Sequence, residues 1–515
     1  MAPVSQDRPI LRSPSSRATG LLLSAILVLW IVLAASVAAT RAPWSNEAWA
    51  ANPAVTFVDH GYLGTAILES KGTWLQGVDQ HLYWMMPLHP LVQAAWYRVF
   101  GFGLIRQRLL SVAFGAVALV SWFFIIGDLT GQRFIALLAV CLIGFERTFL
   151  AAAGNGRMDM MCASLGATAI ASYLLLRGSR PRIAILVSHS LAAASIWTHP
   201  CGLLYAALLV LLMLHLDRHR LRPGDIALAL APYLFAGGLW SLYIAQAPAD
   251  FIRQFGGNVS GFAGEYTHQQ RFAGLRAPLE ALHREWSLRY FPAFGFASLG
   301  STGGWFQASW LVAVVLATIA ILFHPGLRKE RPIRMLFAAA GVVLLLMTIF
   351  EGMKFTNYLV YSVPFLGALL ATTAGLLLET HRRSSVLLAA LLLFLAVPQL
   401  ATVLSQIRAN PLRNEFQPVA DFLSRNSAPD DRVIAGAEFA YVFGFTGRIR
   451  DDVRLGYQSG MQPVLIVTNG WYRDWFARSA DGDPELHAYL QHRVLDDYEV
   501  VFKSGDYIVY RSRQK

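Results

Sequence analysis

The chain has 515 residues, of which 55% are hydrophobic and only 15% charged, with a formal net charge of +11. Soluble globular domains carry about a quarter charged residues, so this composition excludes an ordinary soluble protein. The positive charge lies mainly in short loops between apolar blocks, which is typical of membrane topology and not of a nucleic-acid-binding face. We therefore predict a polytopic α-helical membrane protein whose partners include membrane lipids and no nucleic acid.

Apolar blocks close to the length of a bilayer-crossing helix recur along the chain. The first block ends in small residues, as a signal peptide does, but its length and the many later blocks favour a retained helix. We predict eleven transmembrane helices, at residues 19–40, 106–126, 134–150, 159–176, 183–198, 202–216, 226–246, 305–323, 335–350, 358–378 and 386–404.

The loop charges orient these helices. With the N-terminus inside, sixteen Lys and Arg residues lie on inner segments and three on short outer loops. The positive-inside rule therefore predicts a cytoplasmic N-terminus, with residues 41–105 and 247–304 as long outer loops. Within the first loop, Pro90 to Gly101 reads as an amphipathic helix lying along the membrane interface.

The residue composition changes near residue 405, where apolar runs become shorter and turn-forming residues become frequent again. We predict a transmembrane domain over 1–404 and a soluble extracytoplasmic α/β domain over 405–515, a usual size for an independent unit. Its expected elements are a helix at 416–424, strands at 432–436 and 463–468, a short helix at 438–445, a helix at 485–493 and a hairpin formed by 498–503 and 507–510.

Polar side chains that suit group transfer follow several of the predicted helices on their outer side. Two carboxylates and several cations at one membrane rim fit chemistry on a phosphorylated lipid, since a carboxylate removes a proton from an acceptor hydroxyl and cations offset charge on a departing phosphate. The candidates are the acids Glu47 and Asp159, the cations Arg157, Arg271 and Lys354, and the neighbouring His268 and Tyr358.

Each candidate also has an ordinary structural interpretation. Glu47 suits the first turn of a helix and Asp159 a helix cap. Arg157 and Lys354 suit the membrane interface as anchoring side chains. The three cysteines show no metal-ligand spacing, and no His pairing indicates a metal. No cofactor is therefore predicted, although a divalent metal ion stays open as an alternative.

Several of these motifs resemble GT-C glycosyltransferases of the protein-mannosyltransferase and aminoarabinose-transferase type, which use polyprenyl-phosphate sugars. The resemblance runs from the first span to about residue 380. It rests on Asn46-Glu47 after the first helix, on Met86 to Pro90 leading to Phe100-Gly101, on Arg106 to Leu110, on Arg157 to Met160, on Lys354 with Tyr358 and Pro364, and on His268 to Phe272.

Two departures from this pattern bear on the chemistry. The usual Asp-Glu pair has become Asn46-Glu47, so only Glu47 is available as a base from that motif. The acid and lysine that precede the proline run in the aminoarabinose enzymes are Met85 and Met86. This loss argues against aminoarabinose transfer itself and against a zinc site of that branch.

The resemblance implies an inverting hexosyl- or pentosyltransferase of the inner (plasma) membrane. A monosaccharide would move from a polyprenyl-phosphate donor to a lipopolysaccharide, glycan or protein acceptor on the outer face. Glu47, Asp159 or both would act as base, while Lys354, Arg271 and Arg157, with Tyr358 and His268, would hold the phosphate. The alternatives are a flippase of a lipid-linked sugar, argued against by smooth helices without a repeat, and a non-catalytic assembly protein.

Overall fold

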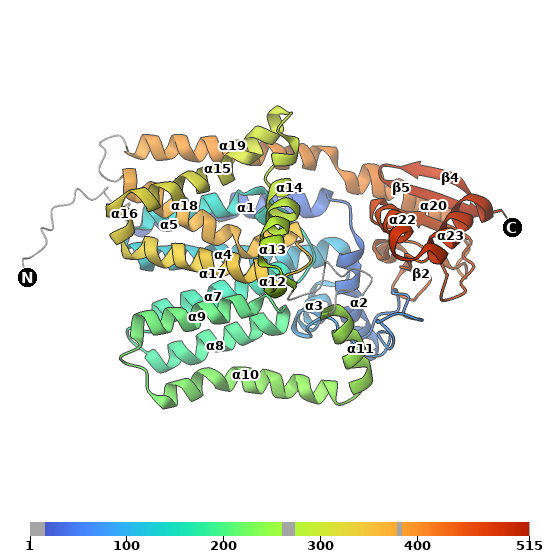
Figure 1. Cartoon of the computed structure of the whole chain (residues 1–515), viewed down its shortest axis with the longest axis horizontal. Coiled ribbons are helices and arrows are strands. Elements are labelled where there is room, and N and C mark those ends of the chain that lie inside the picture. The colour runs from blue at the N-terminus through green and yellow to red at the C-terminus, as the bar shows by residue number, and fades with distance from the viewer. Residues whose placement is uncertain (1–15, 260–272, 379–383, 514–515) are drawn as a thin grey trace, which may run out of the picture.

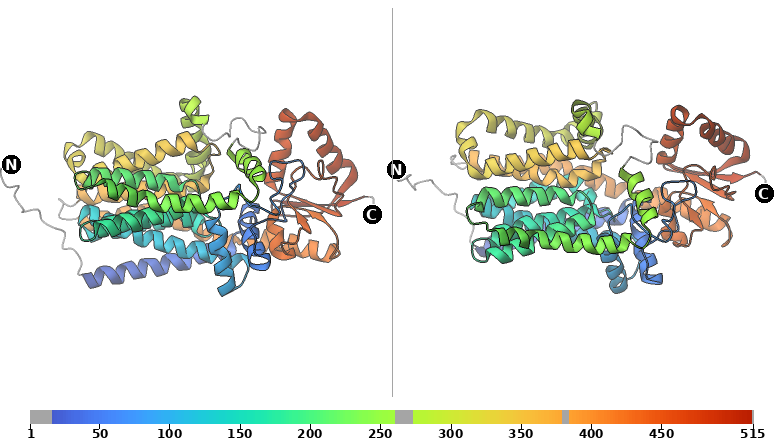
Figure 2. Two further views of the ribbon diagram at one scale, coloured as in Figure 1. Left: turned by 90° about the horizontal axis from the view of Figure 1, so that it is seen from below. Right: turned by 60° about the horizontal axis from the view of Figure 1, so that its bottom comes forward.

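The computed structural model describes residues 16–259, 273–378 and 384–513. Arg271 and His268, two of the predicted phosphate ligands, lie outside these residues. Long helices pack side by side into a bundle, and a small α/β domain lies at one end of it (Figures 1 and 2). The bundle helices are α1 (Ser16–Thr40), α4 (Leu104–Thr130), α5 (Arg133–Gly144), α6 (Arg147–Ala153), α7 (Asp159–Leu176), α8 (Pro181–Thr198), α9 (Gly202–Asp217), α10 (Pro223–Ile244), α15 (Thr302–Phe323), α17 (Arg331–Phe350), α18 (Val363–Leu378) and α19 (Ser384–Ala409).

Each of the eleven predicted spans coincides with one of these helices or, in one case, with a pair. Seven helices of the described chain are long and apolar enough to cross a membrane, or eight if the pair α5 and α6 forms one span. The predicted span at 134–150 is divided between α5 and α6, which meet at an angle of 71°. Helix α5 ends at Gly144, and Glu146 caps α6 by accepting a hydrogen bond from the Phe149 amide at 2.9 Å.

The core of the bundle combines large aromatic rings with small residues. Trp30 is fully buried and donates a hydrogen bond to the Gly144 carbonyl at 2.8 Å. A Cβ atom added to Gly115 would lie 2.4 Å from the Trp30 ring, so only glycine fits there. Such close approach through small residues is a common packing mode of membrane helices.

Shorter elements cover the end of the bundle that carries the α/β domain. The helix predicted from Pro90 to Gly101 is present as α3 (Leu88–Phe100). The predicted start of the tenth span at residue 358 is wrong, because Thr356–Tyr361 form a 3₁₀-helix, η4, ahead of α18. The other elements are α2 (Ser45–His60), α11 (Pro248–Val259), α12 (Ala273–Arg276), α13 (Pro278–Arg284), η2 (Glu285–Tyr290), α14 (Phe291–Ala293) and η3 (Phe296–Ser298), while α16 (Pro325–Lys329) precedes α17.

The C-terminal region contains a five-stranded sheet of order β2-β1-β3-β5-β4. Strand β1 pairs in parallel with β2 and β3, and the predicted hairpin forms the antiparallel edge. The elements, joined to α19 through η5 (Leu412–Phe416), are α20 (Gln417–Asn426), β1 (Val433–Ile434), η6 (Ala437–Phe439), α21 (Ala440–Phe443), β2 (Ile449–Arg450), β3 (Leu465–Thr468), α22 (Gly470–Gly482), α23 (Pro484–His492), η7 (Arg493–Asp497), β4 (Tyr498–Ser504) and β5 (Tyr507–Ser512).

Buried polar contacts join this region to α2. Ser45 donates a hydrogen bond to the Glu438 carboxyl at 2.6 Å, and the Trp49 indole donates to Asp451 at 2.9 Å. Burial raises the pKa of Glu438 to about 7, although the Ser45 contact acts in the opposite direction. The α/β domain is therefore attached to the helix that carries Glu47.

Candidate active site at one end of the helix bundle

Glu47 lies in the first turn of α2 and is completely buried. Its two carboxylate oxygens accept hydrogen bonds from Arg108 Nε at 2.7 Å and Arg108 Nη2 at 2.6 Å. The Gly156 amide donates a third bond at 2.8 Å. Burial opposes ionisation of Glu47, but the Arg108 guanidinium outweighs it and keeps the pKa of the carboxyl below its ordinary value.

The hydrogen-bond donors of Arg108 are also occupied by internal partners. Arg108 is completely buried near the start of α4, and its terminal nitrogens also donate to the backbone carbonyls of Ala38 at 2.7 Å and Arg41 at 2.8 Å. A bidentate pair of this kind fixes both side chains. Glu47 therefore joins α1, α2 and α4 and presents no unoccupied oxygen to a substrate.

The second acid, Asp159, is the first residue of α7, and Arg157 lies just before that helix. Arg157 Nε donates to Asp159 Oδ2 at 2.7 Å, and both side chains are buried. The guanidinium lies over the Trp44 ring, 5.3 Å from its centroid, which is a cation–π contact. Among the described residues, its terminal nitrogens make no hydrogen bond or ion pair. Arg157 thus holds Asp159 with one nitrogen and keeps two for a ligand.

The other oxygen of Asp159 is only loosely held. Tyr361 Oη lies 3.4 Å from Asp159 Oδ1, beyond the usual length of a hydroxyl–carboxylate hydrogen bond. His199 stacks on the Tyr361 ring and lies 3.4 Å from Tyr358 Oη. Nearby His89 is neutral at pH 7, because burial lowers its pKa to about 3. Asp159 is therefore the buried carboxylate of this cluster that has room for a further hydrogen bond.

Lys354 belongs to a different charged network. Its Nζ lies 2.9 Å from Glu285 Oε2 and donates to the carbonyls of Met347 and Thr348 at 3.1 and 2.8 Å. Arg289 bridges Glu285 and Glu351, so two cations face two carboxylates. Burial lowers the pKa of Lys354, and Glu285 only partly offsets this effect. A phosphate would therefore have to replace an existing partner of Lys354.

The helix η4 connects the two clusters. It begins after Lys354, and its last residue, Tyr361, contacts Asp159. Six residues of 3₁₀-helix at a rise of about 2 Å each span roughly 12 Å. One short helix thus separates the Lys354 network from the Asp159 cluster.

A large apolar cavity reaches the Lys354 network at Glu351 and the residues that follow His199. It has a volume of about 1050 Å³ and lies between α8, α9, α10 and α17. At the site end it is lined by Pro200, Cys201 and Glu351, next to His199 and Lys354. At the other end it is lined by Leu221 and Ile226. The cavity therefore follows the helices for most of their length and fits an extended apolar chain.

The structure places five of the predicted site residues at this end of the bundle. The Gly156 amide contacts Glu47, and Arg157 contacts Asp159, so the short segment 156–159 lies between the two acids. Lys354 lies at the far end of η4 from Asp159. A Cβ atom at Gly156 would lie 2.7 Å from the Gln107 side chain, so this approach needs glycine. Within the described residues, no group of three His, Cys, Asp or Glu side chains is arranged to hold a metal ion.

Several polar residues of the candidate site were not predicted from the sequence. Arg108 is a charged residue inside an apolar span, which is a signal for function or for a buried pair. His199 similarly ends an apolar helix. Glu285 and Arg289 carried no such signal, because they lie in a polar loop whose fold brings them to Glu351.

Known proteins resemble the chain in structure but not in sequence. No protein family and no curated protein matches the sequence. ArnT from Cupriavidus metallidurans, solved bound to undecaprenyl phosphate, superposes with a TM-score of 0.57 at 15% identity, over 96% of this chain and 98% of that one. The oligosaccharyltransferase AglB from Archaeoglobus fulgidus, in complex with an inhibitory peptide and a dolichol-phosphate, gives 0.53 at 10% identity, over 94% and 74%. Both are GT-C proteins, so this multi-pass membrane chain has the GT-C fold.

Proposed function

We propose that the protein is an inverting glycosyltransferase that moves a monosaccharide from a polyprenyl-phosphate donor to a cell-envelope acceptor. The observation that carries the proposal is the apolar cavity of about 1050 Å³ that is lined by Glu351, a member of the Lys354 network, and by Pro200 and Cys201, which follow His199 in the chain. A lipid tail in this cavity would present its phosphate and sugar between an acid and a cation. The two solved neighbours, bound to undecaprenyl phosphate and dolichol-phosphate, support a lipid phosphate as ligand.

In this mechanism Asp159 is the base. Its Oδ1 accepts the proton of the acceptor hydroxyl, whose oxygen attacks the anomeric carbon as the bond to the donor phosphate breaks. Arg157 keeps the carboxylate oriented through the Nε contact of 2.7 Å. Glu47 acts as a positioning residue, because all its partners are internal.

The leaving phosphate lies on the opposite side of the sugar. Lys354 contacts it by exchanging Glu285 for the phosphate, and Arg289 keeps Glu285 paired during that exchange. Arg271, Tyr358 and His268 are proposed to complete the phosphate site, as the motif resemblance implies. The acceptor is a lipopolysaccharide, glycan or protein on the outer face, where the C-terminal α/β domain covers the site.

Reconstitution with a labelled donor tests this function. Purified protein in proteoliposomes, given a polyprenyl-phosphate sugar and envelope acceptors, should form a covalent product of inverted anomeric configuration. The Ala207→Trp variant narrows the apolar cavity, so it should raise the KM for long-chain donors more than for short-chain donors. Translocation of labelled lipid without covalent product would instead identify a flippase and refute the proposal.

A further inference from the structure

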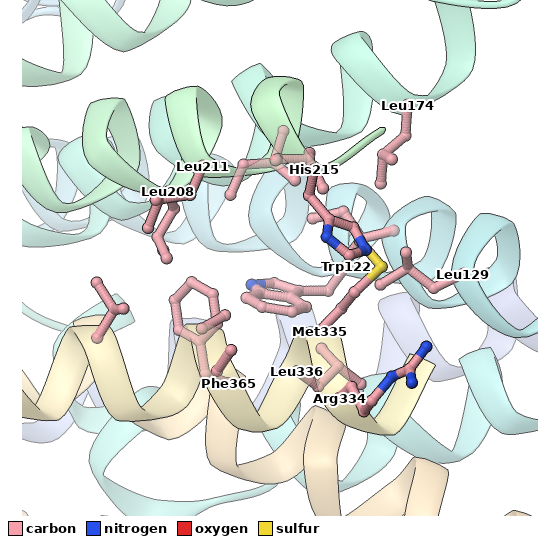
Figure 3. A pocket seen from close by; sticks show the side chains of 16 residues that line it. Trp122, Leu129, Leu174, Leu208, Leu211, His215, Arg334, Met335, Leu336 and Phe365 are labelled. Carbon is pink, nitrogen blue, oxygen red and sulfur yellow. The ribbon is translucent and has the colours of Figure 1, made fainter. Parts of the chain in front are cut away.

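A second apolar cavity lies toward the opposite end of the bundle from the candidate active site. It has a volume of about 410 Å³ and is enclosed by α4, α7, α9, α17 and α18. Figure 3 shows Trp122 and Phe365 in its wall, with His215 and Arg334 toward the end where Leu129 and Leu174 lie. The cavity is thus apolar inside and carries basic side chains at one end.

A polar pocket adjoins this basic end. Its volume is about 590 Å³, and Leu174 lines both spaces. Three arginines line the polar pocket together with two aspartates; these residues are Arg177, Arg220, Arg331, Asp128 and Asp217. With Arg334 at the junction, four arginines face two carboxylates.

Internal ion pairs leave part of this positive charge uncompensated. Asp217 accepts a hydrogen bond from Tyr173 at 2.8 Å and lies 3.2 Å from Arg177. Arg177 Nε is nevertheless buried without a hydrogen-bond partner in the described chain. Arg331 and Arg334 have no carboxylate within 4.0 Å among the residues that the structure describes.

We propose that this pair of cavities binds an anionic glycerophospholipid. Arg177, Arg331 and Arg334 contact the phosphate and glycerol headgroup, and one acyl chain enters the apolar cavity beside Trp122 and Phe365. Basic residues at the membrane ends of helices are common. Arginines that only orient the protein in the membrane would not need an apolar cavity beside them, whereas these arginines have one. The joined cationic and apolar spaces match the two halves of an anionic lipid.

This site is distinct from the proposed donor site. Helix α17 runs from Arg331 to Phe350, and 20 helical residues cover about 30 Å. A phosphate beside Arg331 is therefore far from one beside Lys354. The two apolar cavities share Leu211 and Val342 in their walls, so a donor tail is the competing occupant of the smaller cavity.

Native mass spectrometry of the purified protein tests the proposal. Phosphatidylglycerol should be retained more strongly than phosphatidylcholine with the same acyl chains. Because each membrane-facing arginine contributes about fivefold to the affinity for anionic lipid, the Arg331→Gln/Arg334→Gln variant should bind phosphatidylglycerol about 25-fold more weakly. The Ala339→Trp variant fills the cavity and should weaken retention of both lipids.

A matched control separates this site from general surface charge. Arg328 and Lys329 are exposed at the same end of the bundle but line neither cavity, so Arg328→Gln/Lys329→Gln should bind phosphatidylglycerol like the wild type. Equal loss in this control, or equal retention of the two lipids by the wild type, would overturn the proposal. Displacement of phospholipid by a polyprenyl phosphate that is insensitive to Arg331 and Arg334 would also overturn it, in favour of a donor tail.

Discussion

Glu47 and Asp159 are both buried acids paired with an arginine at the same end of the bundle, yet their surroundings differ. Both oxygens of Glu47 are occupied by Arg108 and the Gly156 amide. Asp159 has one oxygen held by Arg157 and one facing Tyr361 at 3.4 Å. The comparison teaches that occupancy of the oxygens, rather than burial, distinguishes a structural acid from a proposed base.

The sharpest way to break this comparison is the Asp159→Asn substitution. It removes the proposed base, so transfer should fall by about 10²–10⁴-fold. Stability should fall less than in Glu47→Gln, because Asp159 has one short contact with its arginine and Glu47 has two. Single-turnover transfer rates and thermal unfolding in the same detergent measure both effects. Asp59→Asn, at an exposed acid of the same end, is the control and should keep full activity.

The Glu47→Gln substitution should mainly lower the stability of the fold. Leaving Arg108 buried without its carboxylate should reduce the free energy of unfolding by about 3–5 kcal/mol, as for other broken buried pairs. Denaturant unfolding in mixed micelles measures this loss. If Glu47→Gln unfolded like the wild type but no longer transferred sugar, then Glu47 would be the base and the comparison would be wrong.

Substitutions in the Lys354 network test the proposed binding site of the donor phosphate. Lys354→Met should weaken donor binding by about 10–100-fold, the range of a charged hydrogen bond. Glu285→Gln frees Lys354 from its competitor and should strengthen donor binding. Equilibrium binding of labelled donor measures the affinity of both variants. Weaker binding by both variants would indicate a purely structural network.

The smallest effect concerns the domain contact beside Glu47. Because Glu438 has a pKa of about 7 in the folded protein and a lower one when unfolded, its folded form binds the proton more tightly. This contribution to stability is present at pH 4.5 and is lost as the pH rises to about 7, a change of about 2–3 kcal/mol. The difference in unfolding temperature between wild type and Glu438→Gln should therefore depend on pH across this window, and parallel pH profiles would contradict it.

Much of the fold was predictable because apolar length and loop charge act locally. The predicted span at 159–176, for example, coincides with α7. The bend at Glu146 was missed, although Glu146, Arg147 and Thr148 interrupt the apolar run, because a polar break alone does not show that Glu146 caps a new helix through the Phe149 amide. The start of α18 was likewise missed, because the 3₁₀ geometry of η4 depends on its contacts with α6 and α7.

The sequence motifs singled out candidate residues but not the contacts between them. Short motifs located Glu47, Arg157, Asp159 and Lys354, because ionisable residues beside membrane helices are uncommon. No local pattern shows that Arg108 occupies both oxygens of Glu47 from another helix. The roles of these residues stay predictions until the variants are measured.

One side chain connects the C-terminal α/β domain to the candidate site. Gln107 accepts a hydrogen bond from Tyr441 at 2.6 Å and donates to the backbone oxygens of Glu47 at 3.0 Å and Gly156 at 2.7 Å. A binding event on the α/β domain that tilts α21 would thus be transmitted mechanically to the chain preceding Asp159. Deleting the α/β domain would remove the hydrogen bond from Tyr441 to Gln107, and the remaining helices would hold Asp159 less firmly.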